Sequence, residues 1–219
     1  MKTLQGFTLS EVLITLGIIG IIAAMTLPEL VEKHQKKVVV TRLKKFYSAI
    51  NQAVRLSEAE NGSYEYWEYP DTNNNYELNK VFYDKYLAKY LKVYEAGYFS
   101  ANNTNYVLIK LADGTAFLLN YSGGFDIIFY PRASKSLDNI SGNNFSFTRD
   151  RFVFAFNKAG TTEQKSYVEP YTFTWDGTRE SLLSTDINKY ACNKNSDGSQ
   201  FCAKLIQYDN WEIKDDYPW

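Results

Sequence analysis

The sequence has little of what most enzymes and metal proteins need. Its 219 residues include two cysteines and one histidine, too few for an ordinary transition-metal site. It has no G-x-S-x-G element, no P-loop and no C-x-x-C pair. A net charge of −1 gives it no overall basic field that would attract nucleic acid. We therefore expect no enzymatic activity, no cofactor and no specific nucleic-acid partner.

The apolar residues are concentrated at the N-terminus. A nearly uninterrupted apolar run extends from Val12 to Leu27, and Pro28 follows it. The 22 residues from Phe7 to Pro28 would span about 33 Å as a helix, and the hydrocarbon core of a bilayer is about 30 Å thick. This segment is therefore long enough to cross a membrane.

One carboxylate near the front of this segment separates three interpretations. A secretory signal peptide would use the basic Lys2, but Glu11 interrupts its apolar core and Ala23-Ala24-Met25 is a poor cleavage site. A plain membrane anchor would carry Glu11 at a cost in free energy, because carboxylates are unfavourable within a bilayer. In the third interpretation Glu11 is functional.

The residues Gly6-Phe7-Thr8-Leu9-Ser10-Glu11, with the apolar run after them, resemble the prepilin cleavage and N-methylation motif. This motif occurs in type IV pilins and in the pseudopilins of type II secretion. The resemblance implies that prepilin peptidase cleaves between Gly6 and Phe7, that the new amine of Phe7 is methylated, and that Glu11 is the signature acid. Pro28 also lies where helices of this family usually carry a proline.

The physical chemistry of the segment agrees with the resemblance. Cleavage would leave a cationic amine on Phe7 at the end of an apolar helix, where an unpaired charge is unfavourable. Glu11 of a neighbouring subunit would neutralise that amine and set the axial register. Gly17, Gly20 and Ala24 would let helices approach closely, and Gly20 and Ala24 form a small-xxx-small pair. The alternative for the glycines is simple tolerance within a membrane helix.

Beyond Pro28 the pattern predicts an amphipathic continuation of the helix to about Asn61-Gly62. The residues of its buried stripe recur at three- and four-residue steps: Val39, Leu43, Phe46, Ile50, Ala53 and Ser57. The opposite face is polar and includes six basic residues between Lys33 and Lys45, with His34 among them at the surface. We interpret this face as solvated near the lipid headgroups, and a lipid- or DNA-binding patch is the alternative.

Membrane orientation rests on the resemblance. The positive-inside rule alone would keep the basic segment after the apolar run in the cytoplasm. The resemblance instead implies a cytoplasmic leader, where the peptidase cuts, and an extracytoplasmic head.

The rest of the chain predicts an α+β fold, with a long N-terminal helix packed on an antiparallel β-sheet in a pilin-like head. Residues 61–104 predict a connection that holds one short helix. Strand-like runs follow at 106–111, 115–121, 125–130, 151–157 and 167–175. The expected divisions are a leader (1–6), a transmembrane and assembly helix (7–28), its amphipathic continuation (29–60) and a globular head (61–219).

The two cysteines bracket a short loop near the C-terminus. In an oxidising compartment Cys192 and Cys202 would form a disulfide, worth about 3 kcal/mol on a loop-entropy model; two free buried thiols are the alternative. A cysteine-bracketed loop at this position also resembles the pilin family. The final segment, 211–219, is aromatic and acidic. We expect it to pack back on the head, and a binding edge is the alternative.

Within the cysteine loop, Asn193, Asn195 and Asp197 place oxygen ligands at alternate positions before a glycine, as in a calcium loop. The acid that would complete the pattern is absent, because position 204 is lysine. A polar turn is therefore the preferred interpretation, and calcium binding is the alternative.

Together these features predict a structural subunit of a type IV pilus or a type II secretion pseudopilus. We expect one pass through the inner (cytoplasmic) membrane and assembly into a periplasmic or cell-surface filament. The expected partners are homologous pilin or pseudopilin subunits, prepilin peptidase, the inner-membrane assembly machinery and membrane lipid. The alternative is a membrane-tethered extracytoplasmic module that binds a sugar or peptide through surface aromatics.

Overall fold

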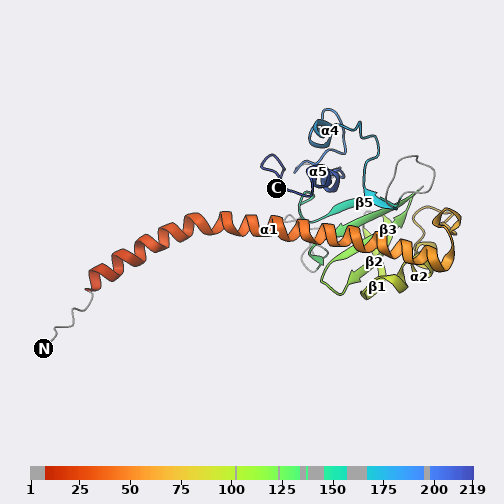
Figure 1. Cartoon of the computed structure of the whole chain (residues 1–219), viewed down its shortest axis with the longest axis horizontal. Coiled ribbons are helices and arrows are strands. Elements are labelled where there is room, and N and C mark those ends of the chain that lie inside the picture. The colour runs from red at the N-terminus through yellow and green to blue at the C-terminus, as the bar shows by residue number, and fades with distance from the viewer. Residues whose placement is uncertain are drawn as a thin grey trace. The chain divides into compact units, whose positions relative to one another are not determined.

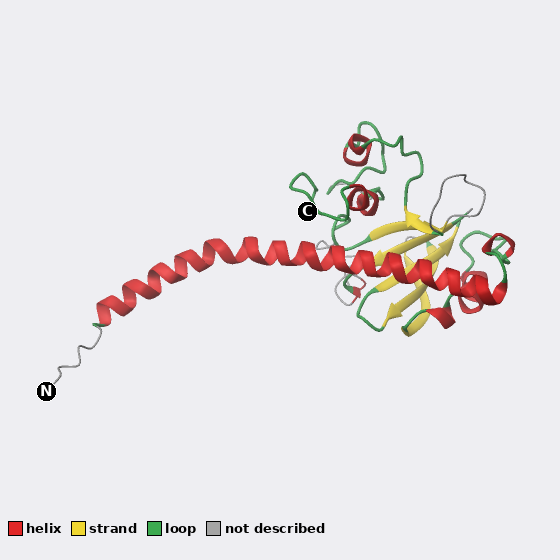
Figure 2. Cartoon of the chain, in the orientation of Figure 1, coloured by secondary structure: helices red, strands yellow, loops and turns green. Residues whose placement is uncertain are grey.

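The computed structural model describes residues 8–101, 103–122, 124–133, 137, 146–156, 167–194 and 198–219. The chain divides into two compact units, residues 1–39 and 40–219. Helix α1 (Leu9–Asn61) contributes its N-terminal part to the first unit and its C-terminal part to the second. Figure 1 traces the elements along the chain, and Figure 2 shows their secondary structure.

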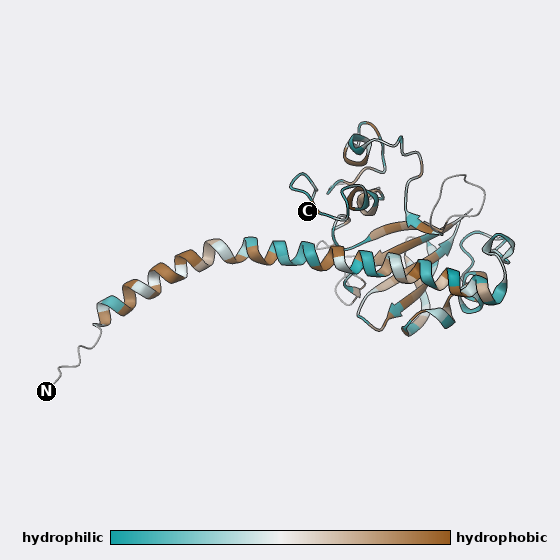
Figure 3. Ribbon diagram, viewed as in Figure 1, coloured by the Kyte–Doolittle hydropathy of each residue, from teal (hydrophilic) through white to brown (hydrophobic). Residues whose placement is uncertain are grey.

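In the first unit, α1 is apolar from Val12 to Pro28 except for Thr15 and Thr26 (Figure 3). Such a helix has no polar face to turn toward water, which is typical of a membrane span or of a helix enclosed by others. α1 is the one helix of the described residues that is long and apolar enough to cross a membrane. Pro28 has no N–H, so the carbonyl of Ala24 lacks its usual helical donor.

The second unit contains a six-stranded sheet in which each strand pairs antiparallel with the next along the chain. The strands are β1 (Val93–Ala101), β2 (Thr104–Leu111), β3 (Ala116–Tyr121), β4 (Phe125–Tyr130), β5 (Phe152–Phe156) and β6 (Val168–Pro170). Gly114, in the turn before β3, has a φ of 81°, which glycine adopts without strain. The α+β class predicted from the sequence, a long helix followed by an antiparallel sheet, is confirmed.

Two details of the predicted sheet are wrong. β1 lies in the segment 61–104 that the sequence predicts as a connection with one helix. This edge strand is exposed or half-exposed along its whole length, so it lacks the alternation that identifies a half-buried strand. The predicted strand 167–175 shortens to β6, which ends at Pro170, a residue without a backbone donor.

The core of the second unit forms where α1 meets one face of the sheet. All six residues of the predicted stripe are buried, and the five from Leu43 to Ser57 lie in this unit. Phe46 lies at the centre, with its ring 4.3 Å from that of Phe129, 5.3 Å from Phe154 and 5.4 Å from Phe117. The same sheet face supplies further buried residues on neighbouring strands: Val107, Ile109, Leu119, Ile127 and Phe152.

α1 also pairs with the short edge strand β6. The Asn51 side chain donates from Nδ2 to the Val168 carbonyl and accepts from the Val168 N–H, both at 2.9 Å. The amide thus pairs with Val168 as a neighbouring strand would, so these two polar backbone groups are satisfied at the sheet edge.

Short helices complete the second unit. They are η1 (Tyr64–Tyr66), α2 (Tyr76–Tyr86), η2 (Ala88–Tyr90), α4 (Arg179–Leu183) and α5 (Cys202–Tyr208). Asn75 caps α2 by accepting from the Leu78 N–H at 3.2 Å. Trp67 stacks on Tyr86 of α2 with ring centroids 4.3 Å apart.

Asp126 on β4 faces away from the Phe46 core. It alternates with the buried Phe125 and Ile127 along the strand. Its carboxylate has no hydrogen bond from a described residue, and it lines a hollow of about 470 Å³ beside Tyr171 and Phe173. Burial raises the pKa of Asp126 to about 6.

Replacing Phe46 with alanine should lower the free energy of unfolding by about 3–5 kcal/mol, because a buried aromatic ring would leave a cavity. The matched control, Phe173→Ala, removes the same atoms from a residue that is 62% exposed and should change it by less than about 0.5 kcal/mol. Denaturation of the full chain in detergent, followed by near-ultraviolet circular dichroism, measures both. Equal losses in the two variants would contradict a core role for Phe46.

Asp126 should make the fold less stable as pH rises. Its folded pKa of about 6 lies above the unfolded value of about 3.9, so the folded state binds more protons across this interval and stability falls from about pH 4 to 6. Asp126→Asn should therefore stabilise the protein at pH 8, by about 3 kcal/mol, and leave it nearly unchanged at pH 4.

Unfolding midpoints of the full chain at these two pH values test this expectation. Asp113→Asn serves as the opposite control, because hydrogen bonds from Lys45 and Thr115 outweigh burial and lower the pKa of Asp113. That variant should lose stability at pH 8. A gain for Asp126→Asn that is the same at both pH values would contradict the titration.

Candidate assembly site and head surfaces

The predicted processing site lies at the very start of the chain. Gly6, Phe7 and the rest of the leader 1–6 fall outside the described residues, which begin at Thr8. Cleavage between Gly6 and Phe7 and methylation of Phe7 therefore stay predictions. The first structural information on the site comes from the residues that follow it.

Glu11 closes the first turn of α1 by a reciprocal cap with Thr8. The Thr8 N–H and the Thr8 hydroxyl both donate to Glu11 Oε2 at 2.8 Å. The Glu11 N–H donates to Thr8 Oγ1 at 3.3 Å. This arrangement is a capping box. Its T-x-x-E spacing is visible in the sequence, so the sequence pattern alone would have identified Thr8 as a residue of this site. Glu11 Oε1 has no partner among the described residues.

The rest of this segment presents apolar and small side chains outward. Large apolar residues remain exposed from Leu9 to Val31, with Met25 74% exposed. A Cβ built at Gly17 or at Gly20 would meet nothing within 4 Å. Contacts within the described chain therefore do not require glycine there, although glycine lowers helix stability by about 1 kcal/mol relative to alanine. Ala24, one turn after Gly20, is also exposed.

The basic segment after Pro28 is balanced in part by its own helix. Lys33 pairs with Glu29 at 2.6 Å, and Lys36 pairs with Glu32 at 2.7 Å, both at i,i+4 spacing. His34 is exposed. These pairs favour the interpretation of this face as solvated over that of a bare cationic patch.

Two basic residues further along α1 bind within the second unit. Arg42 donates to the Pro131 carbonyl, and Lys45 forms an ion pair with Asp113 at 2.7 Å. Both side chains help to fix α1 on the head, so part of the basic run has a structural role.

The predicted disulfide between Cys192 and Cys202 is confirmed. Both cysteines are buried, and the Cys192 N–H donates to the Leu182 carbonyl of α4 at 2.8 Å. Of the calcium residues, Asn195 and Asp197 lie outside the described residues, and Asn193 donates its N–H to the Ser199 hydroxyl at 3.0 Å. Among described residues, no group of three or more His, Cys, Asp or Glu side chains could hold a metal ion.

The C-terminal segment packs back on the head, as the sequence predicts. Arg179 donates to both oxygens of Asp209 and to both oxygens of Asp216, at 2.7–2.8 Å. These bonds lower the pKa of each aspartate. Tyr217 is buried and donates its hydroxyl to the Thr148 carbonyl.

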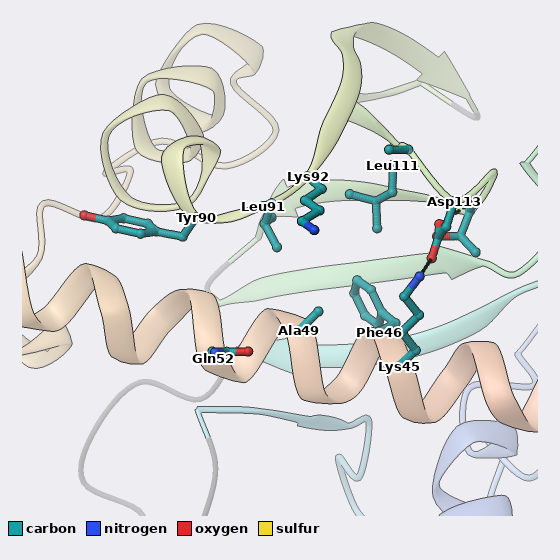
Figure 4. Close-up of a pocket in the computed structure, with 11 residues that line it drawn as sticks. Lys45, Phe46, Ala49, Gln52, Tyr90, Leu91, Lys92, Leu111 and Asp113 are labelled. Atoms are coloured by element: carbon teal, nitrogen blue, oxygen red, sulfur yellow. Dashed lines mark hydrogen bonds and ion pairs between the residues drawn. The ribbon is translucent and has the colours of Figure 1, made fainter.

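A groove of about 440 Å³ lies between α1, the end of η2 and the turn from β2 to β3 (Figure 4). Its apolar lining comes from Phe46, Ala49, Leu91 and Leu111. The Lys45–Asp113 ion pair borders one end, and the Lys92 ammonium points into the space. The sequence offers no signal for this site, because three segments distant along the chain form it.

Comparison with known families adds two matches. Residues 1–27 match a family model described as the prokaryotic N-terminal methylation motif. Residues 29–219 match a model described as a family of unknown function, DUF6613. No curated protein and no solved structure matches the chain.

The match to the methylation motif confirms the recognition of a type IV pilin or pseudopilin precursor from Gly6, Phe7 and Glu11. The second match spans most of the length of the chain, so the chain belongs to the DUF6613 family. At its N-terminus it carries the methylation motif of type IV pilin-like precursors.

Proposed function

We propose that the protein is a structural subunit of a type IV pilus or a type II secretion pseudopilus. The observation that carries this proposal is Glu11, the one charged residue in the stretch of α1 from Leu9 to Pro28, whose large apolar side chains are exposed. It lies within the methylation motif. An isolated charge among apolar surfaces requires a partner when those surfaces become buried.

The partner in this proposal is the Phe7 amine of an adjacent subunit. Both hydrogen bonds from Thr8 reach Oε2 of Glu11, so Oε1 can accept from a second molecule while the helix cap stays intact. Gly17, Gly20 and Ala24 would line the approach between helices, since small residues allow close packing without a large apolar driving force.

The membrane arrangement follows from the same proposal. The leader 1–6 would be cytoplasmic, 7–28 would span the inner membrane, and 29–60 would continue as an amphipathic helix. The head 61–219 would be extracytoplasmic, where the Cys192–Cys202 disulfide persists in an oxidising compartment. Prepilin peptidase and the inner-membrane assembly machinery would act on the chain in turn.

A membrane-tethered binding module is the second candidate. Exposed aromatics on the head, such as Tyr66, Tyr94 and Phe173, would suit a sugar or peptide. In that case ligand binding would be independent of Glu11. A filament subunit instead depends on Glu11 for assembly.

Processing gives the first test. Mass spectrometry of the full chain, extracted from the membrane of its native host, should identify Phe7 as the N-terminal residue, with one methyl group on its amine. The same spectrum should show Cys192 joined to Cys202. A mature chain that begins with Met1 would contradict the proposal.

Three variants separate the charge of Glu11 from its role in the helix cap. Glu11→Ala removes both, whereas Glu11→Gln keeps the capping box and removes the charge. Both should lower the yield of filaments sheared from cells at least about tenfold, because the Phe7 amine would be buried without a partner. Thr8→Ala keeps the charge and should assemble to within about twofold of the native protein, since a lost cap costs only about 1 kcal/mol.

Immunoblots of the sheared fraction, with total protein as reference, measure these yields. Normal assembly of Glu11→Gln alongside failure of Glu11→Ala would reduce Glu11 to a capping residue. Normal assembly of both variants would overturn the proposed function.

A further inference from the structure

The groove on the head contains one lysine, Lys92, whose ammonium forms no contact that stabilises the described part of the fold. Lys92 makes no hydrogen bond or ion pair through its ammonium with any residue that the structure describes. Its Nζ points into the groove in Figure 4, beside the apolar side chains of Leu91 and Leu111. A cavity of about 440 Å³ with an apolar lining and one free charge is suited to an apolar group that carries an anion.

A group of this kind is presented elsewhere on the same unit. Tyr66 in η1 is 85% exposed, and the neighbouring Glu65 is exposed and has no ion-pair partner among the described residues. Both neighbours of the pair are held in place. Trp67 is buried and donates from its indole to the Gly62 carbonyl at 2.9 Å, and the Tyr64 N–H donates to Glu58 at 3.0 Å.

The ordered residues on either side of Glu65 and Tyr66 lower the entropic cost of docking. A turn that is already ordered loses little conformational freedom when its exposed ring becomes buried against a partner. Glu65 and Tyr66 therefore form a rigid knob: an aromatic ring beside a free carboxylate.

Other exposed aromatics of the head match the groove less well. Tyr94 lies beside Glu95, but Glu95 already pairs with Lys110 at 2.9 Å. Phe173 lies between two threonines and has no adjacent charge. The combination of an exposed ring and a free carboxylate thus selects the Glu65–Tyr66 knob.

We propose that the Tyr66 ring of one copy of this chain docks in the groove of a second copy, with Glu65 against Lys92. This contact rests on the proposed filament function and adds a specific contact between heads. Because the knob and the groove are different surfaces of one unit, the contact is heterologous and leaves a free knob and a free groove at the ends. Such contacts can continue from copy to copy.

Photo-crosslinking of the full chain in its native host tests the contact. A benzophenone amino acid at position 66 should crosslink to peptides from the groove of another copy, identified by mass spectrometry within 42–55 or 89–115. The same probe at position 94, also an exposed tyrosine, serves as the control and should give few of these products. A crosslink from position 66 to other peptides, or none at all, overturns the inference.

Charge reversal gives an independent test in the same cells. Lys92→Glu and Glu65→Lys should each lower the position-66 crosslink about fivefold, because the ion pair becomes a like-charge contact. The double variant should restore it to within about twofold. Lys44→Glu, which alters an exposed lysine outside the groove, is the control and should leave it unchanged.

Failure of this inference is distinguishable from failure of the proposed function. If the double variant does not recover the crosslink, the Glu65–Lys92 contact is wrong. Filaments that depend on Glu11 would still form in that case. If neither Glu11 variant affects assembly, the filament proposal fails first.

Discussion

Helix α1 has to be stable in two different surroundings, and this constraint shapes most of the chain. From Leu9 to Val31 its large apolar side chains are exposed, a composition suited to lipid or to other apolar helices. From Leu43 onward most apolar side chains keep to one face, and Phe46 packs among three rings of the sheet. One continuous helix is thus an apolar element in the first unit and the central core element of the second.

The charged groups follow the same division. In the apolar part, Glu11 binds only Thr8 among the described residues, through one of its two oxygens. In the basic part, Lys33 and Lys36 have carboxylates one turn away. The interaction energy of a charge pair in apolar surroundings depends strongly on distance and is weakly screened by salt. A contact at Glu11 can therefore fix the axial register of neighbouring helices. Pairs exposed to water carry little energy of this kind.

Periodicity made the helix predictable, because the burial of its C-terminal part is one-sided, whereas the central strand β3 has five successive buried residues. The stripe from Val39 to Ser57 follows from spacing alone, and the strand Phe125–Tyr130 is predicted as a strand-like run after two glycines. β1 could not be found this way, since it is an edge strand without a fully buried face. The same limit applies to the groove, where Lys92 and Lys45 meet only through the tertiary fold. The Thr8–Glu11 cap, in contrast, is a local pattern, and its spacing was available in the sequence.

The two proposed contacts between copies would have different physical bases and therefore different tasks. The contact at Glu11 would be formed by narrow apolar helices with one charge each, so it would set the axial step but leave rotation weakly determined. The contact of Tyr66 with the groove would involve a rigid turn and a shaped surface within one unit, so it would restrict rotation. Each copy would also use the second contact through two separate surfaces, which permits growth without closure. A head that only bound a soluble ligand would have no need for both a free knob and a free groove, and this difference favours a second copy of the chain as the occupant.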